Sequence, residues 1–295
     1  MRQRIRTNLV NQSVREVNEA IYRPQVTHIL HKCYGIAWIC QPYVKYDYRL
    51  IAFTSVIRAL LFDFGGTLDQ PGRHWLDRFH GHYRSVGLDL TRTELDSAYS
   101  FATESGYRAG SSMYQLGMAG LLEFVLEKQF EYLLQAGPSP VSSKLSAESA
   151  RRQLASAIAN KFVSETVLGL EQSRQVLTEL AKRYRLGVVS NFYGNLETVL
   201  TESGIRPLIE VVVDSVRVGH FKPDPEIYRC AIDAFGLKPT EIAMVGDSLD
   251  KDCVPCAGLG MRTVLLAPGA RTTQERSREP DHIIESLDQL KRLAI

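Results

Sequence analysis

The chain contains a series of short apolar runs, rich in Val, Leu and Ile, that alternate with stretches of helical pattern. These runs are apolar throughout, which is typical of parallel strands buried on both faces. A helix between consecutive strands supplies the crossover that parallel pairing requires. We therefore predict an α/β fold with a doubly wound parallel (Rossmann-like) sheet. The predicted strands are 59–63, 185–190, 210–214, 242–246, 263–267 and 282–284.

One long segment interrupts this alternation. No strand pattern appears between residues 71 and 168, and the segment reads as successive helices. We predict an inserted all-helical cap domain at 71–168, within a core domain formed by 58–70 and 169–295. Helices are expected at 74–86, 93–108, 114–134 and 146–167 in the cap, and at 171–184, 195–203, 225–235 and 251–259 in the core.

The first 57 residues lack a clear period and form an N-terminal extension that we expect to be poorly ordered. A short helix is predicted at 13–22, where Ser13 and Glu16 have the spacing of a capping box. Residues 1–58 carry a net charge of +6, whereas the rest of the chain carries −4. Basic-aromatic repeats are absent from this extension, so we expect no nucleic-acid partner.

Other features indicate a cytoplasmic protein without a membrane partner. No run approaches the roughly 18 apolar residues that a membrane span requires, and the start of the chain lacks a signal-peptide pattern. The five cysteines are odd in number and scattered, which favours reduced thiols. Cys253 and Cys256 have the spacing of a redox motif, but helix packing accounts for them better. We expect a monomer or a homodimer.

Polar side chains follow four of the predicted strands. Because the carboxyl ends of parallel strands meet at one edge of a sheet, these side chains should line a single cleft. Carboxylate oxygens suit Mg²⁺, and lysine, hydroxyl and amide groups suit a phosphoryl group. The residues concerned are Asp63, Ser190, Asn191, Lys222, Asp247 and Asp252.

These residues belong to four segments that resemble the motifs of the haloacid dehalogenase (HAD) superfamily, in the same order. The resemblance covers residues 58 to about 284, and a helical insertion after the first motif resembles the cap of that family. The segments are Asp63-Phe-Gly-Gly-Thr67-Leu, Ser190-Asn191, Lys222-Pro-Asp-Pro and Gly246-Asp-Ser-Leu-Asp-Lys-Asp252.

The resemblance implies a catalytic role for each matching residue. Asp63 would be the nucleophile that forms an aspartyl-phosphate, and Lys222 would neutralise charge beside it. Substrate binding would fall to Lys222 with Thr67, Ser190 and Asn191. Mg²⁺ would be held by Asp63, the backbone carbonyl of Gly65, Asp247 and Asp252.

Gly65 is the main departure from the family pattern. Phosphatases of the family usually have an aspartate there, which protonates the leaving oxygen and then deprotonates the attacking water. Losing such a group typically lowers the rate by ~10² to 10⁴. The candidates to replace it are Asp69, His74, His80 and His82. A substrate with a stable leaving anion, such as an acyl phosphate, would need no replacement.

We therefore expect a Mg²⁺-dependent HAD-type hydrolase, a phosphatase acting on a small phosphorylated metabolite. One alternative is a catalytically weak protein that binds a phosphorylated ligand. The other is a dehalogenase- or phosphonatase-like hydrolase. Asp247 argues against a dehalogenase, which needs no metal, and the cap lysines Lys128, Lys144 and Lys161 lie in no distinctive context for a phosphonatase.

Overall fold

The computed structural model describes residues 56–269 and 280–293. The extension predicted at 1–57 lies almost wholly outside the described residues, as does the helix predicted at 13–22. Within the described ranges, no helix combines the length and hydrophobicity that a membrane span would need.

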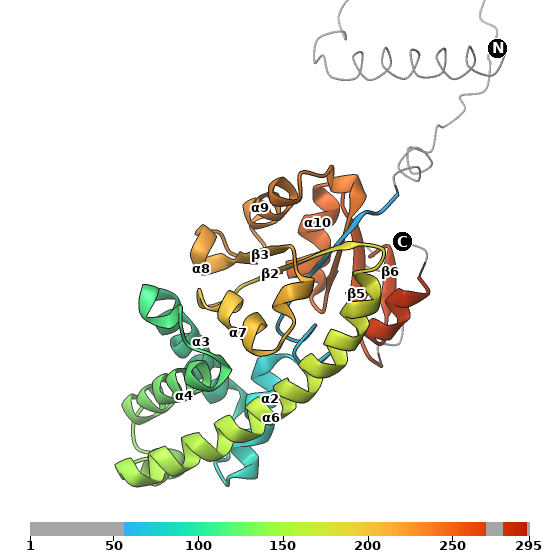
Figure 1. Cartoon of the computed structure of the whole chain (residues 1–295). Helices are drawn as coiled ribbons and strands as arrows, with labels where there is room; N and C mark the ends of the chain where they lie inside the picture. The colour runs from blue at the N-terminus through green and yellow to red at the C-terminus, as the bar shows by residue number, and fades with distance from the viewer. Residues whose placement is uncertain (1–55, 270–279, 294–295) are drawn as a thin grey trace, which may run out of the picture. The chain divides into compact units, whose positions relative to one another are not determined.

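The core is a six-stranded parallel sheet with the order β3-β2-β1-β4-β5-β6 (Figure 1). β1 lies at its centre, between β2 and β4. This order confirms the predicted doubly wound α/β fold, because the direction of strand addition reverses beside β1. The strands are β1 (Ala59–Phe62), β2 (Arg185–Ser190), β3 (Val211–Asp214), β4 (Ile242–Gly246), β5 (Arg262–Leu266) and β6 (His282–Ile284).

Successive residues of β1 enter two different hydrophobic clusters, as expected for a strand covered on both faces. Leu60 and Phe62 belong to a cluster that continues into the inserted helices, whereas Ala59 and Leu61 belong to a second cluster. The second cluster is completed by α9 and α10. The helices outside the insertion are α7 (Leu196–Glu202), α8 (Ser215–Val218), α9 (Pro225–Phe235) and α10 (Val254–Gly258).

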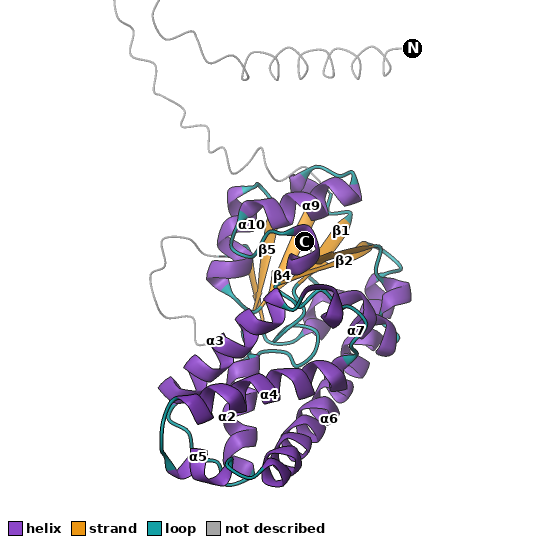
Figure 2. Ribbon diagram, turned by 90° about the vertical axis from the view of Figure 1, so that its left-hand side faces the viewer, coloured by secondary structure: helices purple, strands orange, loops and turns teal. Residues whose placement is uncertain are grey.

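The segment between β1 and β2 is helical throughout its regular structure, and its helices gather at one end of the sheet (Figure 2). They share one continuous apolar cluster with the sheet, so burial holds the two parts together. The helices are α2 (Trp75–Ser85), α3 (Arg92–Arg108), α4 (Met118–Gln135), α5 (Pro140–Lys144) and α6 (Glu148–Leu180). Short 3₁₀ turns occur at Gly110–Met113, Arg206–Leu208, Pro239–Glu241 and Leu287–Lys291, and a π-helical turn at Leu249–Cys253.

The separation of helices 146–167 and 171–184 was wrong, because both belong to the single helix α6. Gly169 lies between the two predicted helices and falls inside α6, where the helix passes the chain that leaves β1. A Cβ atom on Gly169 would lie 1.9 Å from the carbonyl oxygen of Asp69. Glycine therefore permits a close approach here and does not end the helix. The domain boundary predicted between 168 and 169 falls within α6 and stays a prediction.

A buried ion pair joins the turn after β1 to α2 and α6. Asp69 and Arg78 have no exposed surface, and Arg78 Nη1 lies 2.7 Å from Asp69 Oδ2. Arg78 Nη2 donates to the Phe162 carbonyl oxygen at 2.9 Å and to Thr166 Oγ1 at 2.8 Å, both on α6. Asp69 Oδ1 accepts from the Gly66 amide at 2.7 Å. The pair thus fixes the helical insertion to the turn that follows Asp63.

Replacing Arg78 with methionine should lower the free energy of unfolding by ~3–5 kcal/mol, because Asp69 would remain buried without its counter-charge. Urea denaturation measures this change. The control is Arg84→Met, since Arg84 is 65% exposed and lies 3.8 Å from an exposed Asp89. Equal stability of the two variants would show that the buried pair does not hold the insertion to the core.

Candidate active site

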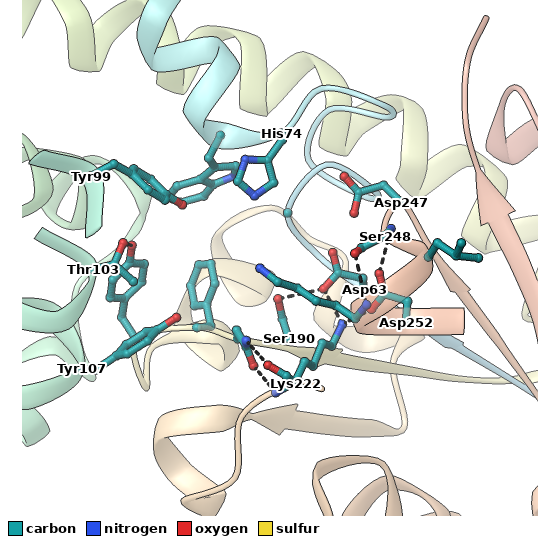
Figure 3. Close-up of a pocket in the computed structure, with 17 residues that line it drawn as sticks. Asp63, His74, Tyr99, Thr103, Tyr107, Ser190, Lys222, Asp247, Ser248 and Asp252 are labelled. Carbon is teal, nitrogen blue, oxygen red and sulfur yellow. Dashed lines mark hydrogen bonds and ion pairs between the residues drawn. The ribbon is translucent and has the colours of Figure 1, made fainter. Parts of the chain in front are cut away.

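A cavity of about 470 Å³ opens at the carboxyl ends of the central strands, between the sheet and the inserted helices. Asp63, Ser190 and Asp247 enter it directly after β1, at the end of β2 and after β4. Lys222 reaches it from the chain that precedes α9 (Figure 3). The sheet topology therefore brings together residues that are up to 184 positions apart in the sequence.

Lys222 links two carboxylates at the floor of this cavity. Its Nζ lies 2.7 Å from Asp63 Oδ1 and 2.6 Å from Asp252 Oδ1. Ser190 Oγ donates to Asp63 Oδ1 at 3.1 Å, and the Ser248 amide donates to Asp252 Oδ2 at 3.1 Å. Burial alone would lower the pKa of Lys222, but Asp252 and Asp63 overcome that effect and raise it. Lys222 is therefore a permanent cation.

Three carboxylates gather around this single ammonium group. Ligand oxygens of Asp63, Asp247 and Asp252 all lie within 4.8 Å of one another. Burial raises the pKa of the Asp247 carboxyl, and repulsion from Asp63 and Asp252 raises it further. Burial also raises the pKa of Asp252, while Lys222 opposes this. The cluster thus has an excess of negative charge that a cation would relieve.

The two glycines after Asp63 have different constraints. Gly66 has a φ of 81°, and a Cβ atom there would lie 2.2 Å from Asp247 Oδ2, so the close approach of Asp247 requires glycine. A Cβ atom on Gly65 would lie 3.4 Å from Trp75 Nε1, which is ordinary van der Waals contact. Gly65 lines the cavity and has room for a side chain.

Asn191 and Thr67 differ in their relation to the cavity. Asn191 lines it, but its side chain is also bonded to the backbone of Lys222: Oδ1 accepts from the Lys222 amide at 2.7 Å, and Nδ2 donates to the Lys222 carbonyl at 3.1 Å. Asn191 therefore positions the chain that carries Lys222. Thr67 does not line the cavity, and its buried Oγ1 has no hydrogen-bond partner among the described residues.

Of the four residues considered as replacements for an acid at position 65, His74 lines the cavity. Asp69 is fully buried, and its Oδ2 accepts from Trp75 Nε1 at 2.6 Å as well as pairing with Arg78. His82 lies in a different hollow, 3.3 Å from Glu165. His80 lines neither of these two cavities. Asp69 and His82 are thus committed to contacts away from Asp63.

Several cavity residues were not identified from the sequence. Tyr99, Thr103 and Tyr107 of α3 lie at intervals of four residues, on one face of the helix, and line the cavity. Their spacing was visible in the sequence, but which face of α3 meets the cavity is decided by the packing of the insertion on the core. Trp75, Phe192, Tyr193, Ser248, Leu249 and Lys251 also contribute to the lining.

The cysteines near this site do not form a reactive pair. Cys253 and Cys256 are buried free thiols. Burial raises the pKa of Cys253 to about 12 and that of Cys256 well above its usual value. Both are thus thiols, not thiolates, at neutral pH, as the helix-packing interpretation expects.

The chain belongs to the haloacid dehalogenase-like hydrolase family, whose sequence model matches residues 57–260. It is 37% identical over 125 residues to haloacid dehalogenase-like hydrolase domain-containing protein 3 of Mus musculus. The matched segment covers 41% of this chain and 49% of that relative. It is 36% identical over 91 residues to a glyceraldehyde 3-phosphate phosphatase of Methanocaldococcus jannaschii, covering 31% of this chain and 40% of that one. The chain thus spans about half the length, or less, of these curated relatives.

Solved structures of dehalogenases share the fold. One, a dehalogenase with an intermediate complex, has a TM-score of 0.54 at 17% identity and covers 82% of this chain and 99% of its own. Another is the L-2-haloacid dehalogenase of Xanthobacter autotrophicus with chloropropionic acid covalently bound. It has a TM-score of 0.51 at 16% identity, and the match covers 80% of this chain and 98% of the dehalogenase. At this identity the likeness establishes the fold alone. The chain therefore has the α/β fold of the haloacid dehalogenase-like hydrolase family to which its sequence belongs.

Proposed function

We propose that the protein is a Mg²⁺-dependent phosphatase that acts on a small phosphorylated metabolite through an aspartyl-phosphate at Asp63. The observation that carries this proposal is the environment of Asp63. Its Oδ1 accepts from Ser190 Oγ at 3.1 Å and pairs with Lys222 Nζ at 2.7 Å. A carboxylate at a cavity floor, beside a buried cation, is suited to attack phosphorus.

The donor set fits Mg²⁺. Asp63 and Asp247 offer hard oxygen ligands, and the surplus of negative charge favours a divalent cation. Gly65 lines the same cavity and would add its backbone carbonyl. Asp252 is bound to Lys222 and to the Ser248 amide, so we assign it mainly to holding Lys222. When bound, Mg²⁺ would neutralise charge on the carboxylates and on the phosphoryl oxygens.

Each of the remaining side chains has a separate role in the proposed reaction. Asp63 attacks phosphorus, the bond from phosphorus to the leaving oxygen breaks, and water later releases phosphate from Asp63. Lys222 and Ser190 stabilise negative charge on the phosphoryl oxygens, and Asn191 holds Lys222 in place. Thr67 does not line the cavity, so we assign it no contact with the phosphoryl group. Phosphatase names among relatives, including the glyceraldehyde 3-phosphate phosphatase, support this chemistry over dehalogenation.

His74 is the side chain that we assign to the leaving oxygen in place of an aspartate at position 65. Its Nδ1 accepts from the Leu76 amide at 3.2 Å as the N-cap of α2, so the ring hydrogen is carried by Nε2. Burial lowers the pKa of His74 and keeps the ring neutral. His74 would therefore donate a hydrogen bond without transferring a proton. Because no proton donor is then assigned, a second candidate function is the binding of a phosphorylated ligand with slow turnover.

Asp63→Asn should abolish Mg²⁺-dependent phosphate release from p-nitrophenyl phosphate and acetyl phosphate, with a rate loss of at least ~10³-fold, because an amide cannot replace the nucleophile. Phosphate release measured across these compounds and a metabolite panel tests this. Asp250→Asn is the control, since Asp250 is exposed in the same acidic loop. Absence of release by the unmodified protein from every compound would favour the ligand-binding function.

Mg²⁺ should stabilise the protein by roughly 1.4–2.7 kcal/mol at 10 to 100 times its dissociation constant, because the folded state alone gathers the carboxylates. Urea denaturation with and without Mg²⁺ measures this. Asp247→Asn should remove the stabilisation, and Asp250→Asn should retain it. Equal stabilisation of both variants would place the Mg²⁺ site elsewhere.

Gly65→Asp should raise turnover of alkyl phosphates by ~10²-fold or more, since it supplies the missing acid and base. Trp75 lies at van der Waals distance from the new Cβ, so the side chain can be accommodated. Gly65→Asn is the matched control, because it has the same shape and cannot transfer the proton. A loss of turnover in the aspartate variant, with the fold retained, would show that glycine serves a different chemistry.

A further inference from the structure

The wall of the cavity opposite Asp63 is built from aromatic rings and hydroxyl groups. Tyr99, Thr103 and Tyr107 of α3 face the side chains of the sheet edge across the cavity (Figure 3). Tyr193 joins them from the loop after β2: its hydroxyl lies 3.4 Å from Thr103 Oγ1, and its ring centroid lies 5.4 Å from that of Tyr107. Tyr107 also lies 4.9 Å from the ring of Phe221.

This wall is uncharged. The cavity residues contributed by the inserted helices are His74, Trp75, Tyr99, Thr103 and Tyr107, and none of them is an acid, a lysine or an arginine. Burial raises the pKa of Tyr193 to about 12, so its hydroxyl stays protonated, and His74 stays neutral. Every charged residue of the lining comes from the sheet edge; among them Lys251 is exposed, and its charge adds to the effect of burial in lowering the pKa of His74.

Such a wall discriminates between leaving groups by charge. A carboxylate or ammonium group placed against Tyr99, Thr103 and Tyr107 would lose its hydration, and none of these three side chains supplies a counter-charge, which is unfavourable. A neutral ring would instead gain offset or edge-to-face contacts with Tyr107, Tyr193 and Trp75. The volume of about 470 Å³ suits a phosphoryl group with one such ring attached.

The absence of a carboxylate at Gly65 favours the same class of compound. A phenol has a pKa of about 10, whereas the pKa of water is about 15.7 and alkyl alcohols resemble water. An aryl oxide therefore leaves phosphorus with far less need of a proton donor than an alkoxide does. A neutral hydrogen-bond donor such as His74 is sufficient for an aryl oxide but not for an alkoxide.

We propose that the substrates are phosphate monoesters of uncharged aryl groups, recognised by Tyr99, Thr103, Tyr107 and Tyr193; this rests on the phosphatase function proposed above. Asp63 takes the phosphoryl group, and the electron pair of the broken bond stays on the aryl oxygen, which takes up a proton from solvent. Water then transfers its oxygen to phosphorus, releasing inorganic phosphate and restoring Asp63. The net change is hydrolysis to a phenol and phosphate, with no other reactant.

The test compares kcat/KM for phenyl phosphate, 4-carboxyphenyl phosphate, benzyl phosphate and acetyl phosphate. Phenyl phosphate should exceed 4-carboxyphenyl phosphate by ~10-fold or more, because the added carboxylate meets the uncharged wall. It should also exceed benzyl phosphate, which keeps the ring but leaves as an alkoxide. Thr103→Lys should reverse the preference for phenyl phosphate over 4-carboxyphenyl phosphate, because it supplies a cation for the carboxylate. Thr103→Val, which has a similar shape and no charge, should retain that preference.

The outcomes separate the two proposals. Asp63-dependent release from acetyl phosphate, with equal kcat/KM for phenyl and 4-carboxyphenyl phosphate, would overturn the aryl specificity and leave the phosphatase function intact. No release from any of the four compounds would overturn the aryl specificity, and no release from the metabolite panel as well would overturn the phosphatase function. If Thr103→Lys fails to fold, Tyr107→Leu tests the ring contact in its place: it should lower kcat/KM for phenyl phosphate by more than it lowers kcat/KM for acetyl phosphate, which has no ring. An equal reduction for both compounds would overturn the aryl specificity.

Discussion

The pairing of Lys222 with Asp63 and Asp252 is the interaction on which the site depends. One buried ammonium lies 2.7 Å from Asp63, directly after β1, and 2.6 Å from Asp252, in the π-helical turn that follows β4. Buried charges of this kind are tolerated only when each has a partner. A third carboxylate, Asp247, leaves the cluster with more negative than positive charge. The arrangement is costly for the fold alone and is understandable as a site for a cation and a phosphoryl group.

The buried pair of Asp69 and Arg78 connects this cluster to the inserted helices. Asp69 accepts from the Gly66 amide in the turn after Asp63, while Arg78 reaches the Phe162 carbonyl and Thr166 on α6. The position of the cavity wall is therefore coupled to the turn that carries the nucleophile. An aromatic, uncharged wall and a glycine at position 65 then favour the same leaving group by two separate physical effects, desolvation and proton demand.

Much of the sheet and its edge was predictable because the signals are local. A buried parallel strand is an apolar run wherever it lies, and its carboxyl end adjoins the site by topology, so Asp63, Ser190, Asn191, Lys222, Asp247 and Asp252 could be expected to lie close together. The cavity wall was not predictable in this way. Tyr99, Thr103 and Tyr107 of α3 share a face, but only the packing of the insertion on the core shows that this face lines the cavity that contains Asp63.

One wrong prediction, the separation of two helices within α6, and the contacts of one candidate acid have physical causes that sequence periodicity does not report. The predicted break between residues 167 and 171 does not occur, because Gly169 permits α6 to pass the backbone of Asp69. Asp69, considered as a substitute acid, is instead fully paired with Arg78, Trp75 and the Gly66 amide. The first case depends on a contact between segments that are about 100 residues apart. The second depends on side chains and a backbone amide within the turn and helix that follow Asp63.

The central claim is that Asp63 accepts the phosphoryl group, and chemical trapping tests it most directly. Protein mixed with Mg²⁺ and acetyl phosphate, quenched in acid and treated with borohydride, should contain homoserine in place of Asp63, as peptide mass spectrometry would detect, because borohydride reduces an acyl phosphate but not a free carboxylate. Asp63 unchanged in protein that is releasing phosphate, or homoserine at another position, would contradict the account.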